Sequence, residues 1–240
     1  MRYQALCCDY DGTLATAGRV LPETVQALER LIASGRRLVL VTGRELDDLR
    51  RICPPLDLFE YVVAENGALL YHPATGAETL LAERPPESFL AALRHKGVTP
   101  VSLGRVIVAT WEPHEKAVLE AVHELGLELQ VIFNKGAVMV LPSGVNKASG
   151  LKRALRKMRL SAYNVVGVGD AENDHAFLAM CGCSVAVANA LPTLKSTADI
   201  VTTAEQGAGV VELAEELLRD DLASRASQRQ RHASVTCALP

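Results

Sequence analysis

The sequence predicts a doubly wound parallel α/β sheet with one small inserted α+β domain. Short apolar runs, many of them β-branched, recur along the chain and are typical of strands buried on both faces of a parallel sheet. Helix-like stretches alternate with these runs, as in proteins with helices on both faces of the sheet. In the middle of the chain the order becomes helix, strand, strand, helix, strand, strand. An insert of αββαββ order therefore interrupts the main domain.

The expected strands of the main sheet are apolar runs at residues 3–8, 37–42, 61–65, 163–169 and 184–187. The helix-like stretches that separate or follow them are residues 22–34, 45–53, 146–158, 173–181 and 209–219. The first stretch has both boundary signals, since Pro22 lies at a first-turn position and Gly35 follows its last residue. Strand and helix alternate, so we predict a Rossmann-like core.

The insert begins near the helix-breaking pair Pro85-Pro86. Helix-like segments at 86–97 and 113–126 each precede two strand-like segments, at 98–104 and 105–111, and at 128–134 and 136–142. Two helices on one face of a four-stranded antiparallel sheet can bury a small core of their own. We therefore predict a discontinuous main domain, residues 1–82 and 144–222, and a cap domain, residues 83–143.

The last residues, 223–240, are polar, rich in arginine and without periodicity, which predicts a disordered tail. An alternative in which these arginines contact RNA or lipid has no second basic patch or aromatic cluster to support it.

Composition and charge limit the classes of partner. A formal net charge of −3 gives no large field of either sign to attract nucleic acid or an anionic membrane. The start of the chain does not resemble a signal peptide, and the longest uncharged stretch, residues 176–194, is interrupted by Gly182, Asn189 and Pro192. The six cysteines match no C-x-x-C pattern and are interpreted as free thiols. We expect a cytoplasmic monomer or homodimer whose partners are small molecules.

Two carboxylates follow the first expected strand with one residue between them. Asp9 and Asp11 leave the carboxyl end of that strand on about the same side. Like charges this close repel, so a divalent cation, a lysine or a shared proton must compensate them. Gly12 allows the chain to turn sharply, and the amides of the turn can then face an anion.

More polar groups are expected at the same edge of the sheet. Thr42-Gly43-Arg44 ends the second strand, and residues 169–174 (GDAEND) end a later one. In open α/β sheets, ligands bind in the crevice beyond the carboxyl ends of the strands. Lys147 lies near the start of the helix that leads into the later strand. One lysine does not balance the carboxylates expected there, so Mg²⁺ or a similar hard cation is predicted, with these carboxylates as candidate ligands: Asp9, Asp11, Asp170 and Asp174.

Each motif also has a purely structural interpretation. D-x-D-G-T can be a solvated turn, and G-D-x-x-N-D can be an N-cap followed by an acidic first turn. Four such elements in order, three of them ending apolar strands, favour a functional site.

The chain resembles the haloacid-dehalogenase (HAD)-like hydrolase superfamily, in its sugar-phosphatase or Cof-type branch with a type IIB cap, similar to phosphoglycolate and sucrose-phosphate phosphatases. The motifs that carry the resemblance are DYDGT at 9–13, the threonine of VTGR at 41–44, Lys147, and GDAEND at 169–174. The resemblance covers residues 1 to about 220. It implies a Mg²⁺-dependent phosphatase that forms an aspartyl phosphate.

The resemblance also implies roles for individual residues. Asp9 would be the nucleophile and Asp11 the general acid and base, with the Asp11 carbonyl a further metal ligand. Thr42 and Lys147 would contact phosphate, and Asp170 would bind the metal. Asp174 would bind it directly or through other groups, supported by Asn173. Because they lie at strand ends, further candidates for substrate or cap contacts are Gly43, Arg44 and the loop Glu65-Asn66-Gly67.

Three other classes of protein share parts of this pattern. A sugar phosphomutase of the same architecture would use Asp9 in the same way, but such enzymes tend to carry Ser-Asp where this chain has Thr42-Gly43-Arg44. A signalling receiver also combines an acidic pocket with a threonine and a lysine, but it has no cap. A dinucleotide-binding loop at Gly167-Val168-Gly169 lacks the third glycine.

The substrate is expected to be a small phosphorylated metabolite, either a sugar phosphate or phosphoglycolate. Selection among such substrates is expected to depend on side chains of the cap domain. The single tryptophan, Trp111, closes a cap strand and is expected to pack into the cap core, as most buried tryptophans do. The alternative places Trp111, or neighbours such as Arg105, on the sheet face that covers the active site.

Overall fold

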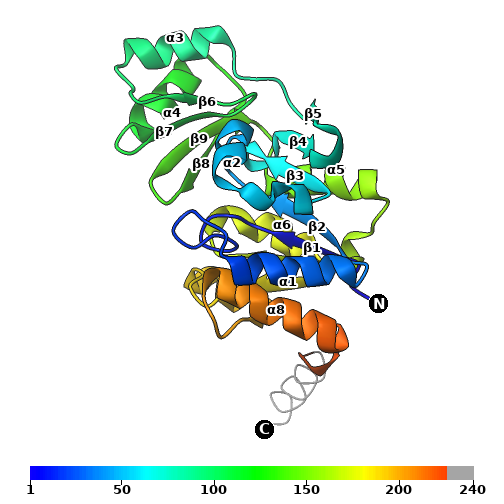
Figure 1. The fold of residues 1–240 in the computed structure, drawn as a ribbon. Helices are drawn as coiled ribbons and strands as arrows, with labels where there is room; N and C mark the ends of the chain where they lie inside the picture. The colour runs from blue at the N-terminus through cyan, green and yellow to red at the C-terminus, as the bar shows by residue number, and fades with distance from the viewer. Residues whose placement is uncertain (226–240) are drawn as a thin grey trace.

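A computed structural model describes residues 1–225, and one large sheet organises most of them (Figure 1). Its strands are β1 (Ala5–Cys8), β2 (Arg37–Val41), β3 (Tyr61–Ala64), β4 (Leu69–His72), β5 (Ala77–Leu80), β10 (Val165–Gly169), β11 (Cys183–Ala186) and β12 (Ile200–Val201). They lie in the order β12-β11-β10-β1-β2-β3-β4-β5. Neighbouring strands are parallel except for the pairs β3–β4 and β4–β5, which are antiparallel, so β4 alone runs against the others.

The predicted fold class is confirmed, and three short strands were not anticipated. β4, β5 and β12 lie at the two edges of the sheet. Every residue of β5 is exposed, so this strand has no apolar pattern by which it could be recognised. An antiparallel edge on an otherwise parallel sheet is common in α/β proteins.

Helices cover both faces of the sheet. α1 (Pro22–Ala33) packs beside α8 (Gln206–Asp220), and α5 (Lys147–Met158) packs beside α6 (His175–Met180) (Figure 1). The β1-α1-β2 and β10-α6-β11 units run in opposite directions along the sheet. Because such crossovers are right-handed, they place α1 and α6 on opposite faces. Two shorter helices, α2 (Leu46–Ile52) and α7 (Pro192–Thr197), follow β2 and β11.

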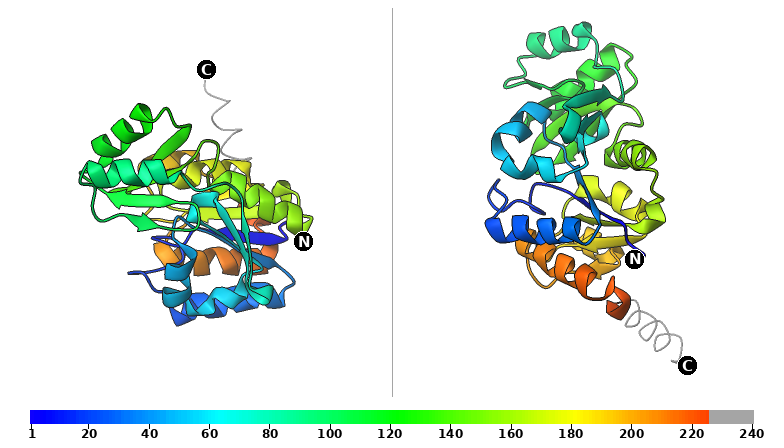
Figure 2. Two further views of the ribbon diagram at one scale, coloured as in Figure 1. Left: turned by 90° about the horizontal axis from the view of Figure 1, so that it is seen from above. Right: turned by 45° about the vertical axis from the view of Figure 1, so that its right-hand side comes forward.

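The residues between β5 and α5 form two helices and a second, four-stranded sheet, which lie at one end of the molecule (Figure 2). Its elements are α3 (Glu87–His95), β6 (Ser102–Leu103), β7 (Val108–Trp111), α4 (Glu115–Glu124), β8 (Leu129–Asn134) and β9 (Ala137–Pro142). The strands are antiparallel in the order β6-β7-β9-β8. The order of elements is the αββαββ order that the sequence indicates, whereas the domain boundaries at 82/83 and 143/144 stay a prediction.

The two faces of the second sheet have different neighbours. Val108, Val138 and Val140 point toward α3 and α4 and form one apolar cluster with them. Side chains alternate between the faces of a strand, so Ala109 and Trp111 of β7 and Met139 of β9 lie on the other face.

The expectation that Trp111 packs into the core between sheet and helices is wrong. Its residue surface is 55% exposed, and it lines a cavity on the opposite face. The period of two along β7 explains this, because Val108 faces the helices and Trp111 is three residues further on.

The predicted disordered tail falls mostly outside the described residues. Residues 223–225 are helical, and the Arg225 guanidinium contacts the Glu216 carboxylate at 3.0 Å, which ties this turn to α8. Residues 226–240 lie beyond the part of the chain that the structure describes.

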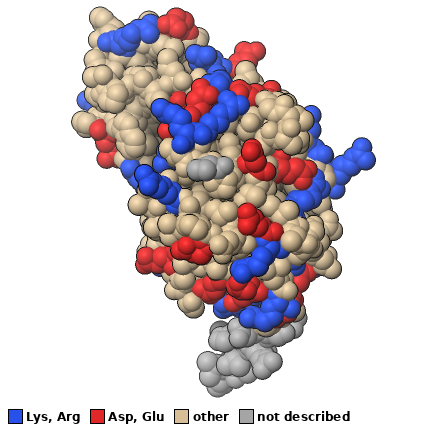
Figure 3. All heavy atoms as spheres, viewed as in Figure 1, with Lys and Arg blue, Asp and Glu red and all other residues tan. Residues whose placement is uncertain are grey.

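On the face seen in Figure 3, lysine and arginine side chains are interspersed with aspartate and glutamate. Within residues 1–225, no helix has both the length and the apolar character needed to cross a membrane.

Candidate active site

The candidate site lies where the strand order of the main sheet reverses. β1 pairs with β10 on one side and with β2 on the other, and Cys8 is in register with Val168. Asp9 follows Cys8, and Asp170 follows Gly169, the last residue of β10, so both leave adjacent parallel strands at the same edge. The Asp9 N–H donates to the Val168 carbonyl at 3.0 Å. This is the position at which open α/β sheets bind ligands.

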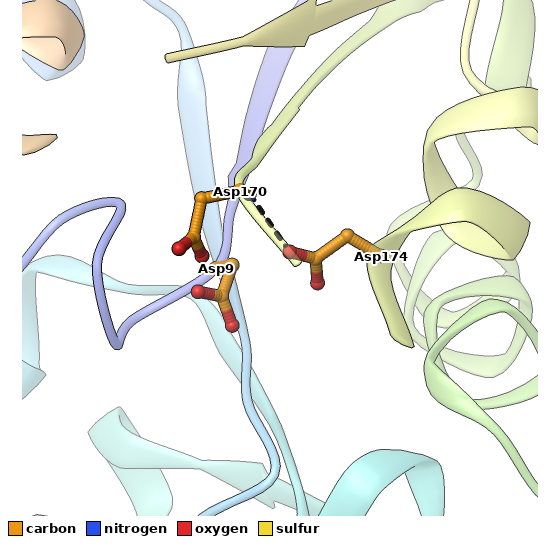
Figure 4. A group of neighbouring side chains, drawn as sticks. All are labelled: Asp9, Asp170 and Asp174. Atoms are coloured by element: carbon orange, nitrogen blue, oxygen red, sulfur yellow. Dashed lines mark hydrogen bonds between the residues drawn. The ribbon is translucent and has the colours of Figure 1, made fainter. Parts of the chain in front are cut away.

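Three buried carboxylates converge at this edge. Asp9, Asp170 and Asp174 each offer an oxygen within 4.8 Å of the others, and Figure 4 shows Asp9 and Asp170 side by side with Asp174 opposite them. Burial, followed by the charge of Asp174, raises the pKa of Asp9 to about 8. Burial also raises the pKa of Asp170. Burial of these negative charges close together is therefore unfavourable, and a bound cation would reduce their repulsion.

Lys147 is the buried cation of the cluster. Its ammonium donates to Asp9 Oδ1 at 2.5 Å and to Asp174 Oδ1 at 2.6 Å, and only 1% of its side chain is exposed. Burial alone would lower the pKa of Lys147, but the charges of Asp174 and Asp9 outweigh burial and raise it. Lys147 is therefore a permanent positive charge beside Asp9.

Two local features fix the start of α5, and so the position of Lys147. Asn146 is the N-cap residue, and its side chain and that of Ser149 satisfy each other's main-chain N–H groups. Gly67, at φ +104°, approaches so closely that a Cβ there would lie 1.9 Å from the Asn146 carbonyl oxygen. Only glycine can occupy this position.

Asp174 holds both Lys147 and the loop after β10. Its Oδ2 accepts the N–H groups of Asp170 at 2.9 Å and Ala171 at 3.0 Å, while Oδ1 accepts from Lys147. Both oxygens thus have protein partners. Asp170 Oδ1 accepts from the Thr13 hydroxyl at 3.2 Å, so the DYDGT loop and the later loop are joined directly.

Asp11 faces the cavity and is held by Arg44. The guanidinium donates from Nε to Asp11 Oδ2 at 2.7 Å and from a second nitrogen to Oδ1 at 2.8 Å, and also reaches Asp48 at 2.5 Å. Such a two-pronged contact fixes the orientation of a carboxylate. Arg44 thus lies in the site, in contact with Asp11, and its predicted contact with substrate stays a prediction.

Four more predicted residues lie beside this cluster: Thr42 and Gly43 after β2, Asn66 after β3, and Asn173 after β10. Thr42 is fully buried, and its main-chain carbonyl accepts the Asn66 N–H at 2.9 Å. Asn66 Oδ1 accepts from Asn173 Nδ2 at 3.0 Å, whereas Asn66 Nδ2 and Asn173 Oδ1 have no hydrogen-bond partner among residues 1–225. Gly43 leaves space here, since an added Cβ would be at least 3.6 Å from its neighbours.

A family model described as haloacid dehalogenase-like hydrolase matches residues 6–99 and 104–213 of the chain. The protein belongs to this family. The phosphoglycolate phosphatase of Methanothermobacter thermautotrophicus is 33% identical over 218 residues, which are 87% of this chain and 96% of that protein. Phosphoglycolate phosphatase 2 of Saccharolobus solfataricus is 31% identical over 219 residues, 88% of this chain and 90% of that one. The resemblance seen in the sequence is therefore confirmed.

A solved structure of a haloacid dehalogenase-like hydrolase from Bacteroides thetaiotaomicron has the same fold. Its TM-score is 0.77 at 19% identity, over 90% of this chain and 99% of that one.

The active-site cavity of this haloacid dehalogenase-like hydrolase has a volume of about 520 Å³. Residues of the loop after β1 and of α5, among them Asp9, Asp11 and Lys147, form its polar floor. Residues of the second sheet, among them Trp111 and Met139, form the opposite wall. The second sheet therefore covers the site, as a cap does.

Lys135 is a residue of the site that sequence reasoning missed. It belongs to the second sheet, and its ammonium donates to Asp170 Oδ2 at 2.8 Å and to the Asp11 main-chain carbonyl at 3.0 Å. The only available signal was its place beside Gly136 in an expected turn, which does not show where the turn points.

Glu65 links the two sheets of the hydrolase. Its fully buried carboxylate accepts the N–H groups of Arg105 and Val106 at 2.7 Å and of Ile107 at 3.0 Å. The loop 65–67 was a candidate for a cap contact, and Glu65 makes one. Arg105 contacts Asp47 at 2.6 Å and Glu78 at 3.3 Å, so its side chain joins the sheets at the surface.

Proposed function

We propose that this enzyme is a Mg²⁺-dependent phosphatase that acts on a small phosphorylated metabolite through a phosphorylated Asp9. Membership of the hydrolase family and relatives named phosphatases support the enzyme class. The observation that carries the mechanism is the pairing of Asp9 with Lys147 inside a cluster of buried carboxylates at the strand ends.

The donor set fits Mg²⁺. Asp9 and Asp170 are hard oxygen ligands that lie together, and the Asp11 carbonyl oxygen faces the same place, since Lys135 contacts both it and Asp170. Both oxygens of Asp174 have protein partners, so we propose that Asp174 positions the other groups rather than binding the metal directly. Bound Mg²⁺ would offset the repulsion between Asp9 and the phosphoryl oxygens.

Asp9 and Asp11 carry out the phosphoryl transfer and the proton transfers. A carboxylate oxygen of Asp9 attacks phosphorus, the bond to the leaving oxygen breaks, and an acyl phosphate forms on Asp9. Asp11 gives a proton to the leaving oxygen, then takes one from the water that attacks the acyl phosphate. Inorganic phosphate leaves and the Asp9 carboxylate is restored.

Lys147 and Thr42 serve the phosphoryl group. Lys147 is anchored by Asp174, so its charge stays beside Asp9 when a dianionic phosphate arrives. We propose as donors to phosphoryl oxygens the Thr42 hydroxyl and Asn66 Nδ2, which has no hydrogen-bond partner within residues 1–225. Arg44 fixes the orientation of the Asp11 carboxylate. Gly43, which has no side chain, leaves space beside it in the same loop.

The test is release of phosphate from p-nitrophenyl phosphate with Mg²⁺. We expect activity that EDTA abolishes and that Mg²⁺ restores. Beryllium fluoride should bind on Asp9; binding on any other residue, or full activity in EDTA, would refute the mechanism. Incubation with glucose 1-phosphate separates the alternative phosphomutase, which would give the 6-phosphate instead of free phosphate.

The cytoplasmic location and the monomeric or homodimeric state stay predictions, as does the absence of nucleic-acid and membrane partners.

A further inference from the structure

A second cavity lies between the C-terminal half of α5 and the β4–β5 hairpin. Its volume is about 250 Å³, and it shares no lining residue with the active-site cavity. α5 packs on β3 and β4, whereas β5, at the edge of the main sheet, is exposed at every residue (Figure 1). This cavity, which we call the α5 groove, therefore opens at the edge of the sheet.

The floor of the α5 groove is apolar. Leu70 of β4 is buried and Leu81, after β5, is half-buried, and both line the groove. Thr79 is in register with Leu70, and its hydroxyl has no hydrogen-bond partner within residues 1–225. The side chains from α5 that complete the lining have long aliphatic stems. An apolar group bound here would exchange water for apolar surface, which is favourable.

Three cations form the rim of the α5 groove. Arg153, Arg156 and Lys157 are exposed, and their spacing of three and four residues places them on one face of the helix. Within residues 1–225 their side chains have no hydrogen bond or ion pair, and no acidic residue lines the groove. The sequence has no aspartate or glutamate between residues 129 and 169. The carboxyl end of a helix favours cations, but no side-chain charge offsets their mutual repulsion.

The opposite face of the same hairpin has matched charges. Glu78 precedes Thr79 along β5, so its side chain faces away from the α5 groove. The Glu78 carboxylate pairs with Arg50 at 3.0 Å and with Arg105 at 3.3 Å. The hairpin therefore separates a face of paired charges from a face on which positive charge has no partner in the described chain.

We propose that the α5 groove binds a small organic anion that has an apolar body and two or three acidic groups. The apolar body lies on Leu70 and Leu81, and the carboxylate or phosphate oxygens accept hydrogen bonds from the cations of the rim. Arginine suits this role because its guanidinium stays charged and binds such groups through two parallel hydrogen bonds. Pockets for drug-sized ligands have volumes of about 300–1,000 Å³, so a groove of this size takes a small molecule.

This binding site is independent of the proposed phosphatase reaction. The two sites nevertheless share a helix, because α5 begins at Lys147 and carries the cations of the groove in its second half. A ligand in the groove therefore restrains the helix that holds Lys147.

The probe for the experiment is naphthalene-1,3,6-trisulfonate, a rigid trianion with an apolar ring system and no phosphate ester. Calorimetry at about 0.15 M ionic strength, where distant charges are largely screened, should show that wild type binds it. Inorganic sulfate should bind about 10-fold more weakly or less, because it has no apolar body. Hydrogen exchange should slow at residues 77–81 and 153–159 when the probe is bound.

Arg153→Gln and Arg156→Gln should each weaken probe binding about 10-fold, since each variant loses a charged hydrogen bond. Lys152→Gln is the matched control, because Lys152 is an exposed cation of the same helix that does not line the groove. Its effect on affinity should be less than about 3-fold. Unchanged far-UV circular dichroism would show that the variants are folded.

Four results would each overturn the proposal. Wild type that does not bind the probe has no such site. Sulfate that binds as tightly as the probe would show that the apolar floor contributes nothing. Equal losses of affinity in Arg156→Gln and Lys152→Gln would indicate a diffuse positive field around α5. Slower exchange at residues 9–12 and 42–48, without change at residues 77–81, would place the probe in the active site.

Discussion

Replacing Lys147 with methionine tests the electrostatic logic of the site directly. Methionine has a similar length and no charge, so the variant leaves Asp9 and Asp174 buried without their cation. In the wild type the side chains of these two aspartates are 6% and 0% exposed. Breaking a buried ion pair from one side costs about 3–5 kcal/mol. For a domain of this size that predicts a melting temperature lower by roughly 6–20 °C.

Urea unfolding followed by far-UV circular dichroism measures this cost at neutral pH without added metal. Lys152→Met on the same helix is the control: Lys152 is exposed, and its loss should cost less than about 0.5 kcal/mol. Adding Asp174→Asn to Lys147→Met should recover part of the stability, since the stranded charge of Asp174 is then removed. A cost below about 1 kcal/mol for Lys147→Met, or no recovery in the double variant, would refute the reasoning.

Three further predictions concern other parts of the site. Asp9→Asn should abolish phosphate release, whereas Asp11→Asn, which keeps its main-chain carbonyl, should slow it about 10²–10⁴-fold; equal rates would contradict the separate roles. Because burial and then the charge of Asp174 raise the pKa of Asp9 to about 8, Mg²⁺ must displace a proton below that pH. Its affinity should weaken as pH falls, with proton release seen by calorimetry in two buffers, and a pH-independent affinity would count against this. Glu65→Gln should lower the free energy of unfolding by about 2–4 kcal/mol and speed amide exchange at residues 105–107. The control, Glu78→Gln at an exposed ion pair, should lower it by less than about 1 kcal/mol. Similar losses in the two variants would contradict a role of Glu65 in joining the two sheets.

The sequence predicts which residues meet at this edge of the main sheet, because their meeting follows from chain topology. Asp9, Thr42 and Asp170 each come after an apolar run, and parallel strands bring such positions together without any knowledge of side-chain direction. Lys147 is predicted near the start of the helix-like stretch 146–158, and α5 does begin at Lys147.

The residues that sequence reasoning missed or misplaced depend on orientation between the two sheets. Nothing in a Lys-Gly turn reveals that Lys135 points at Asp170, because that contact depends on how the insert docks. Trp111 was assigned to the wrong face, although the period of two along β7 contains the answer once Val108 is known to face the helices. Long flexible side chains such as Arg44 can be assigned to a site from sequence, but not to a partner.

Strand β1 lies at the centre of the finished sheet, yet one of its neighbours is made late. All of β1 is buried, and it pairs on one side with β10, which begins at Val165. A ribosome therefore completes β2 to β5 and the whole second sheet while one edge of β1 has no strand beside it. An apolar strand with free N–H and C=O groups is a template for pairing with other chains. Fragments that end before β10 are thus expected to aggregate, and any chaperone protection of the nascent protein should be concentrated on its first strand.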